Sequence, residues 1–154
     1  ISGVRYFVSV RVIDVAGKRV LVMHGDTLCI DDHSYQAFRT YSRDPGNQKA
    51  FLAKSLEERI LEAEHIRTQS RQATQLKTDD IMDVNQEAVR TTMREHGVSL
   101  LLHGHTHRPA IHNFLLDGHN AHRIVLGDWY ERDSLLVWDN HGYRFGTVTN
   151  LRSP

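Results

Sequence analysis

The sequence predicts an α/β protein in which a mixed β-sheet is flanked by helices. Three observations support this prediction. Two apolar segments, Val20–Met23 and Leu100–Leu102, each run into a glycine-containing turn that carries histidine. A long helical region separates these segments, and only strand-like segments follow residue 98. This order is typical of half of a mixed sheet sandwich with helices on its outside.

The first expected elements form a hairpin and a short helix. Tyr6–Asp14 alternates in polarity and is rich in β-branched residues, which predicts a strand. The turn Ala16–Lys18 leads into a second expected strand, Arg19–Met23. Asp31–Tyr41 is expected to be helical, because two acidic residues stand in its first turn, where the helix dipole favours negative charge.

The middle of the chain is expected to be helical and the remainder to be strands. A loop at Ser42–Asn47 opens one helical stretch, Gln48–Leu76, which contains no proline or glycine. A second helix is expected from Asp79 or Asp80 to His96, with Gly97 ending it. The expected strands are Val98–His103, Ala110–Leu116, Arg123–Leu126, Ser134–Trp138 and Tyr143–Thr149.

The composition narrows the class of protein. A chain of 154 residues, 40% of them hydrophobic, forms one domain or part of one. Its net charge of zero argues against a nucleic-acid partner. No apolar run approaches the roughly 18 residues of a membrane span. The single cysteine, Cys29, excludes an internal disulfide and is expected to be a packed thiol.

The strongest chemical signal is the pair His105 and His107. The two histidines stand two residues apart just after an apolar strand, and Gly104 frees the backbone so that both imidazoles can face one cavity. The alternative is an alternating strand with two histidines on one solvated face. The apolar lead-in and the glycine favour a metal site, because imidazole is a ligand for Zn, Mn, Fe, Co and Ni.

A second motif, His24-Gly25-Asp26, repeats this layout at the end of the earlier strand. By itself His24 would be a hydrogen-bonded core histidine, but its position after an apolar strand favours a metal ligand. Asp26 is expected to orient the imidazole by accepting a hydrogen bond from it. His103 lies inside its apolar strand and is expected to pack or to support a ligand rather than to bind metal itself.

A basic stripe is predicted between the two histidine motifs. Residues 66–77 contain no acidic residue. Side chains that bind phosphate recur there at intervals of three and four residues, so a helix places them on one face: Arg67, Ser70, Arg71, Thr74 and Lys77. Guanidinium, ammonium and hydroxyl groups on one stripe suit a diphosphate. A merely solvated basic helix face is the alternative, and both interpretations remain open.

Three segments carry a family resemblance: Met23–Asp32, Ile81–Gln86 and His103–Pro109. They resemble the calcineurin-like metallophosphoesterases and, within them, the UDP-2,3-diacylglucosamine pyrophosphatases of lipid A biosynthesis. The resemblance runs from Gly3 to about Phe145. It implies the mixed-sheet sandwich of that superfamily, with a helical lid inserted at about residues 45–78.

The resemblance also implies an activity and its residues. The family hydrolyses UDP-2,3-diacylglucosamine to 2,3-diacylglucosamine 1-phosphate (lipid X) and UMP, usually with two Mn²⁺ ions, in the cytoplasm at the periphery of the inner membrane. His24 and His105 would ligate one metal and His107 the other, and these three are the predicted catalytic residues. The residues expected to contact substrate or line its cleft are Asp32, Tyr35, Arg67, Ser70, Thr74, Lys77 and again His105. Thr74 stands where the family has Asn.

The superfamily's first motifs, Asp-x-His, Gly-Asp-x-x-Asp/Glu and Gly-Asn-His/Arg-Asp, lie upstream of a segment like Gly3–Asp14, and none of them stands there in this sequence. The chain supplies three of the expected ligands, split two and one between the metals, and two imidazoles without a bridging carboxylate cannot hold two Mn²⁺ ions ~3.5–4 Å apart. Residues 1–154 are therefore expected to be the C-terminal part of a single metallophosphoesterase domain. Its expected partner is the missing N-terminal part of the same polypeptide. By itself, this chain is expected to show little or no hydrolysis of the substrate. Two alternatives are another metallophosphoesterase that acts on a different phosphate ester, and a truncated non-catalytic module.

Overall fold

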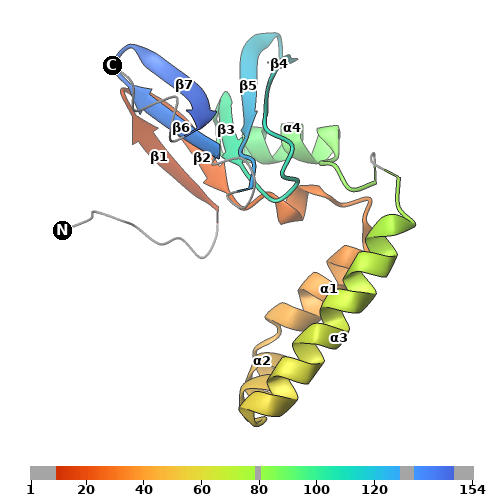
Figure 1. The fold of residues 1–154 in the computed structure, drawn as a ribbon. Helices are drawn as coiled ribbons and strands as arrows, with labels where there is room; N and C mark the ends of the chain where they lie inside the picture. Colours follow the sequence, from red (N-terminus) through yellow and green to blue (C-terminus); the bar gives the residue numbers. More distant parts are fainter. Residues whose placement is uncertain (1–9, 79–80, 129–133, 148–154) are drawn as a thin grey trace, which may run out of the picture. The chain divides into compact units, whose positions relative to one another are not determined.

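The computed structural model describes residues 10–78, 81–128 and 134–147 and divides the chain into two compact units. The sheet unit comprises Ile1–Leu28 and Val84–Pro154, and the helical unit is Cys29–Asp83. Sheet and helices are both present, which confirms the predicted α/β class (Figure 1). The range 45–78 that the resemblance assigns to a lid lies inside the helical unit.

The sheet unit contains a five-stranded mixed sheet of order β1-β2-β3-β5-β4 (Figure 1). Its strands are β1 (Arg11–Val15), β2 (Lys18–Met23), β3 (Leu100–His103), β4 (Ala110–Leu116) and β5 (His119–Val125). The three central strands run parallel, and β1 and β4 pair antiparallel at the two edges. The carboxyl ends of β2 and β3 therefore reach the same edge of the sheet. A separate hairpin is formed by β6 (Ser134–Asp139) and β7 (Gly142–Thr147).

Two tight turns set the register of the edge strands. Ala16 and Gly17 have φ of 52° and 74°, and Asp117 and Gly118 have φ of 53° and 82°. Positive φ at both central residues is the geometry of two-residue hairpins whose twist matches that of the strands. Because the second turn is this short, β5 begins at His119. The prediction that this strand begins at Arg123 after a four-residue turn was wrong.

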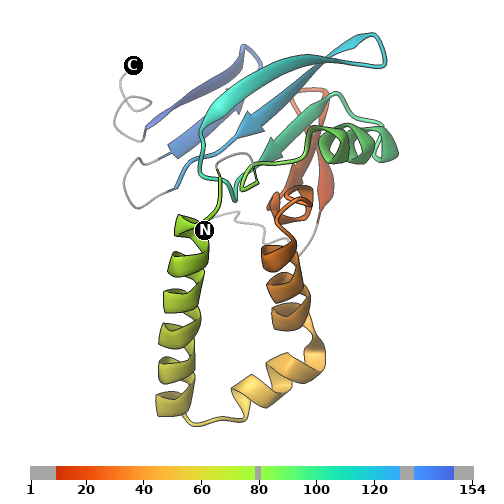
Figure 2. The same ribbon diagram turned by 90° about the vertical axis from the view of Figure 1, so that its right-hand side faces the viewer.

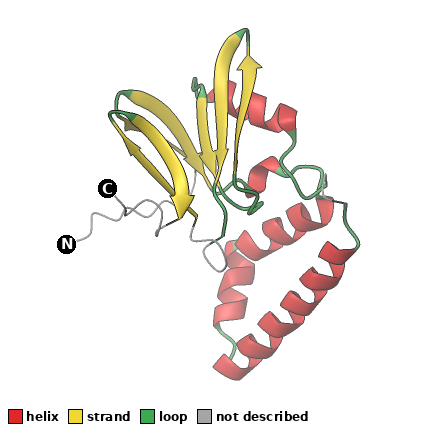
Figure 3. Ribbon diagram, turned by 45° about the horizontal axis from the view of Figure 1, so that its top comes forward, coloured by secondary structure: helices red, strands yellow, loops and turns green. Residues whose placement is uncertain are grey.

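The helical unit contains α1 (His33–Arg43), α2 (Pro45–Leu52) and α3 (Leu56–Gln75). Figure 2 shows α1 and α3 as two arms joined through α2, and all regular structure of the unit is helical (Figure 3). Two predictions were wrong here. The expected loop at 42–47 is mostly helical, because Asp44 caps α2 and Pro45 suits its first position. The expected single helix 48–76 is broken, because Ser55 and Glu58 form a capping box that starts α3.

The core lies in the sheet unit. Leu21, Leu101 and Ile124 come from adjacent strands and are 0–1% exposed. The helix α4 (Gln86–Glu95) adds Val89 and Met93, which are equally buried. In contrast, α1, α2 and α3 contain no buried residue. Within the described part of the chain, no helix combines the length and the apolar character that crossing a membrane requires.

The start of α4 differs from the sequence prediction, which placed it at Asp79 or Asp80. Those two residues lie outside the described ones, and α4 begins at Gln86. The Asn85 side chain accepts hydrogen bonds from the backbone N–H groups of Glu87 and Ala88. Asparagine is a favoured cap because its oxygen satisfies these otherwise unpaired donors. The helix therefore begins at this cap, although the helical spacing of the apolar residues before it predicted an earlier start.

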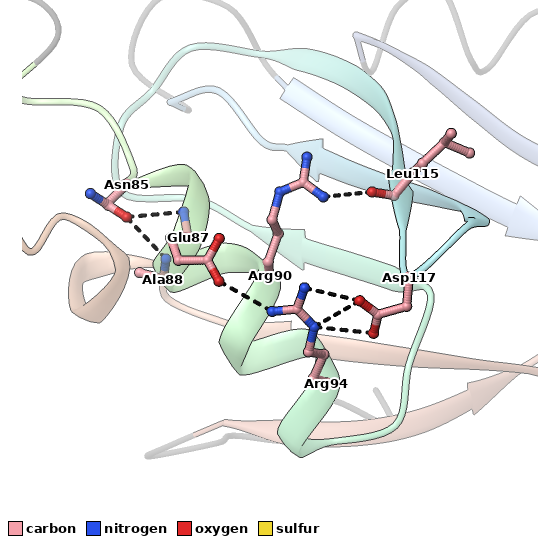
Figure 4. Close-up of polar contacts among 7 residues, drawn as sticks. All are labelled: Asn85, Glu87, Ala88, Arg90, Arg94, Leu115 and Asp117. Atoms are coloured by element: carbon pink, nitrogen blue, oxygen red, sulfur yellow. Dashed lines mark hydrogen bonds and ion pairs between the residues drawn. The ribbon is translucent and has the colours of Figure 1, made fainter.

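Arginines of α4 bind the β4–β5 hairpin (Figure 4). The Arg94 Nε lies 3.0 and 3.1 Å from the two carboxylate oxygens of Asp117. Arg90 donates to the carbonyl of Leu115 and lies over the Phe114 ring. The hydrogen bond from Arg94 holds the pKa of Asp117 below its ordinary value. These contacts are exposed and so contribute little stability, but they fix where α4 meets the turn.

Candidate metal centre

His24 stands directly after β2 and is oriented by a buried carboxylate. Its Nδ1 lies 3.1 Å from Oδ1 of Asp26, whose side chain is 3% exposed, while the His24 side chain is 58% exposed. The expectation that Asp26 pairs with His24 is confirmed. A carboxylate on one ring nitrogen leaves the other, Nε2, available to a metal, and this arrangement is common for ligating histidines.

His105 meets His24 at the same edge of the sheet. The Gly104 N–H donates to the His24 carbonyl at 3.0 Å, which joins the turn after β3 to the turn after β2. The imidazole centroids of His24 and His105 lie 4.9 Å apart. Two of the three predicted ligands are therefore neighbours, although 81 positions separate them in the printed sequence.

The turn after β3 has unusual backbone geometry at both of its motif histidines. His105 has φ 69° and His107 has φ 52°. Non-glycine residues rarely adopt this left-handed region, and where they do the strain is concentrated at functional sites. His107 is exposed on this turn, while His105 is half-buried. An alternating strand with both histidines on one face, the alternative weighed above, is excluded by these backbone angles.

The described residues fit part of a metal-binding set. Two adjacent imidazoles backed by a carboxylate suit a divalent transition metal. Among residues 10–78, 81–128 and 134–147, however, no group of three or more His, Cys, Asp or Glu side chains is arranged to hold an ion. The geometry thus accommodates His24 and His105 in a ligand set that needs further donors.

The helical unit brings two predicted substrate residues together. The Lys77 ammonium lies 2.7 and 2.8 Å from the two carboxylate oxygens of Asp32. Asp32 also caps α1 by accepting from the Tyr35 N–H, and it accepts from the Ser34 hydroxyl. Burial would raise the pKa of Asp32, but these hydrogen bonds, led by the one from Lys77, outweigh it and hold the pKa below the ordinary value.

The other predicted substrate residues lie on the helices of the same unit. Arg67, Ser70 and Thr74 are exposed on α3 at the expected three- and four-residue spacing, and Tyr35 is half-buried on α1. Lys77 follows the end of α3, where its N–H donates to the Thr74 carbonyl at 3.2 Å. The stripe is therefore helical through Thr74 and continues one residue beyond the helix cap.

Sequence reasoning missed one residue near the histidines, Arg123. It lies in β5 and is 2% exposed, and its Nη1 is 3.2 Å from Nε2 of His103. The expectation that His103 packs inside its strand is confirmed, since it is 1% exposed. The sequence feature that could have identified Arg123 is its position as a charged residue directly before the apolar run Ile124–Leu126. A charge at such a position needs a buried partner.

Comparisons with known proteins agree with this geometry. The model of the calcineurin-like phosphoesterases, a family of divalent-metal-binding enzymes, matches residues 2–109. A protein of Serratia proteamaculans named UDP-2,3-diacylglucosamine hydrolase is 45% identical over 135 residues, which cover 88% of this chain and 56% of the relative. Proteins with the same name from Aromatoleum aromaticum and Chromohalobacter salexigens are 49% and 56% identical, over 87% and 73% of this chain and 56% and 46% of their own.

The chain spans about half the length of these curated relatives. The family model, in contrast, covers more than two thirds of the chain and includes both histidine motifs. The residues that the family model matches include His24 and His105, whose imidazoles are neighbours after the carboxyl ends of β2 and β3. The chain belongs to the calcineurin-like phosphoesterases.

Proposed function

We propose that this chain supplies part of the active site of an Mn²⁺-dependent hydrolase that cleaves UDP-2,3-diacylglucosamine to 2,3-diacylglucosamine 1-phosphate and UMP. The single observation that carries the proposal is the pairing of His24 and His105 at one edge of the sheet, 4.9 Å apart. Three relatives whose names state this substrate support its identity. The remaining metal ligands would come from an N-terminal part of the same polypeptide.

The sheet unit would hold the metal ions. His24 and His105 would ligate one ion through their imidazoles and His107 the other, with Asp26 keeping the His24 ring in place. Bound Mn²⁺ would lower the pKa of a water molecule and neutralise phosphoryl oxygens of the diphosphate. The left-handed backbone at His105 and His107 sets the shape of the turn that carries both residues, which would limit the backbone reorganisation that metal binding requires.

The helical unit would bind the glycolipid nucleotide. Arg67, Ser70 and Thr74 offer a guanidinium and two hydroxyls to the diphosphate from one face of α3. Asp32 holds the Lys77 ammonium at its place after this helix. Tyr35 would line the same binding surface from α1.

Exposed apolar side chains of the helical unit support a lipid substrate. Large hydrophobic residues at least two-fifths exposed line its helices: Phe38, Tyr41, Leu52, Leu56, Ile60 and Leu61. Acyl chains would cover apolar surface that otherwise faces water, which is favourable by about 25 cal/mol per Å². A substrate with two acyl chains resides in a membrane, so we also propose that the protein works in the cytoplasm at the periphery of the inner membrane.

A chimera tests the proposal. The 135 residues that align with the Serratia proteamaculans hydrolase would replace their counterparts in that protein. We expect Mn²⁺-dependent release of UMP. His24→Ala and His105→Ala should each lower kcat/KM by about 10³-fold, because loss of an imidazole ligand weakens binding of the Mn²⁺ ion that would activate water and neutralise phosphoryl oxygens. His119→Ala, at an exposed histidine that begins β5, is the matched control.

The substrate range separates the alternatives. Equal rates on the diacylated substrate and on a UDP-sugar without acyl chains would favour a metallophosphoesterase with another substrate. A folded chimera that binds no Mn²⁺ and releases no UMP would contradict the proposal and favour a non-catalytic module.

A further inference from the structure

The imidazole of His103 is buried at the end of β3 with both ring nitrogens engaged. Nδ1 lies 2.8 Å from the carbonyl of Gly104, and Nε2 lies 3.2 Å from Nη1 of Arg123. A guanidinium only donates hydrogen bonds, so Nε2 must accept. The ring hydrogen therefore resides on Nδ1 and is donated to the Gly104 carbonyl. Arg123 thus selects the tautomer of His103.

The same imidazole lies against the turn that carries His24. A Cβ added to Gly25 would stand 2.7 Å from Nδ1 of His103 and 3.2 Å from its Cγ. The glycine, which has φ of 105°, permits this approach. His103 therefore contacts the residue after His24 and binds the carbonyl of the residue before His105.

Backbone hydrogen bonds tie these turns together around the buried ring. The Gly104 N–H donates to the His24 carbonyl, and the Leu126 N–H donates to the His103 carbonyl at 2.8 Å. Arg123 comes from β5, the neighbouring strand, and its 2% exposure means that its charge has been taken out of water. Burying a guanidinium is costly unless its donors are used, and Nη1 of Arg123 is used on His103.

We propose that His103 and Arg123 form a positioning pair that sets the placement of His24 relative to His105. Arg123 fixes the His103 tautomer, and the ring in turn holds the Gly104 carbonyl and supports Gly25. Neither residue is proposed to ligate metal or to contact substrate. The consequence for metal binding rests on the proposed function. The tautomer of His103 and the conformational order of the turns after β2 and β3 do not.

The decisive variant is Arg123→Met, which retains an apolar stem and removes the donors. In the unaltered chain, ¹⁵N NMR of the histidine rings should show His103 with hydrogen on Nδ1 and a bare Nε2. In Arg123→Met we expect loss of that single tautomer and at least tenfold faster amide exchange at Gly104. Arg144→Met is the matched control, because Arg144 is an exposed arginine on β7.

Two further variants keep the proposal falsifiable if Arg123→Met fails to fold. Arg123→Lys retains a donor and should restore the tautomer and slow exchange. His103→Asn retains one donor for the Gly104 carbonyl and should keep the exchange at Gly104 slower than His103→Ala does. A His103 ring with hydrogen on Nε2 or on both nitrogens in the unaltered chain would overturn the proposal, as would unchanged exchange in a folded Arg123→Met.

Metal affinity supplies a separate readout in the chimera described above. We expect Arg123→Met to weaken Mn²⁺ binding, measured by calorimetry, by 10–100-fold, the usual loss when a residue that orients a ligand is removed. Should the unsubstituted chimera bind no Mn²⁺, the proposed function fails while the NMR result still decides on the positioning pair. Unchanged Mn²⁺ affinity in a folded Arg123→Met chimera would contradict the positioning role.

Discussion

The sheet unit and the helical unit are stabilised in different ways. The sheet unit buries its aliphatic residues, so that Leu21, Leu101 and Ile124 have at most 1% of their surface exposed. The three helices of the helical unit bury none, and their order relies on caps at Asp32, Asp44 and Ser55. Nonpolar burial is the larger source of stability, while caps contribute about 1 kcal/mol each.

This difference matches the two tasks proposed above. For the proposed metal site, the sheet unit needs a rigid core that keeps the imidazoles of His24 and His105 adjacent. The helical unit leaves leucines and isoleucines exposed, which is unfavourable in water unless a ligand or surface covers them. The following predictions test this contrast, from the largest expected effect to the smallest.

Leu101→Ala should destabilise the sheet unit by about 2–5 kcal/mol, because it removes a fully buried side chain and leaves a cavity. Urea unfolding followed by circular dichroism measures the loss. Leu61→Ala, at a leucine 66% exposed on α3, is the control and should change stability by less than about 0.5 kcal/mol. Equal losses in the two variants would show that the units do not differ as described.

Gly25→Ala should destabilise the sheet unit by about 2 kcal/mol and disturb the His24 turn. The new Cβ would meet the His103 ring at 2.7 Å, and alanine is strained at φ 105°. The control is Gly17→Ala, where φ is also positive at 74° but a new Cβ would meet no atom within 4 Å. We expect the control to show only backbone strain, about 1 kcal/mol. A larger loss at Gly17 would refute the packing argument.

Asp32→Asn should destabilise the helical unit by about 1 kcal/mol at neutral pH, because it removes the charge that faces Lys77 and keeps a cap acceptor. The folded pKa of Asp32 is lowered, so its stabilisation is present above the ordinary aspartate pKa and is lost as the pH falls through the folded value. The difference between variant and parent should therefore disappear in acid. Hydrogen exchange of the α1 backbone amides, followed over a range of pH, measures this difference in stability. Glu57→Gln is the control.

Leu61→Ser should leave stability nearly unchanged and weaken co-sedimentation with lipid vesicles. The matched control is Leu115→Ser, since Leu115 is a leucine of the sheet unit that is 58% exposed. Equal vesicle binding by the two variants would show that exposed apolar residues of the helical unit have no special role at a lipid surface.

Local signals in the sequence were sufficient for much of the fold and part of the site. Alternation, apolar runs and glycine turns located the strands, and the His24 and His105 motifs were identified from their positions after two such strands. The error in β5 comes from a hairpin turn shorter than expected, and the errors in the helices fall where a short capping signal competes with a longer pattern. Ser55 and Asn85 each accept hydrogen bonds from backbone N–H groups and so begin a helix. Ser55 lies inside the stretch 48–76, for which one continuous helix was predicted. Asn85 lies after residues 79 and 80, where the next helix was predicted to begin.

The sequence by itself determined the residue types of the candidate site, because a histidine after an apolar strand is recognisable from local order. Only the tertiary structure decided which of them meet. The parallel pairing of β2 with β3 brings His24 to His105, and the pairing of β3 with β5 brings Arg123 to His103. Such contacts depend on strand order and register, which long-range burial selects and which no local pattern encodes.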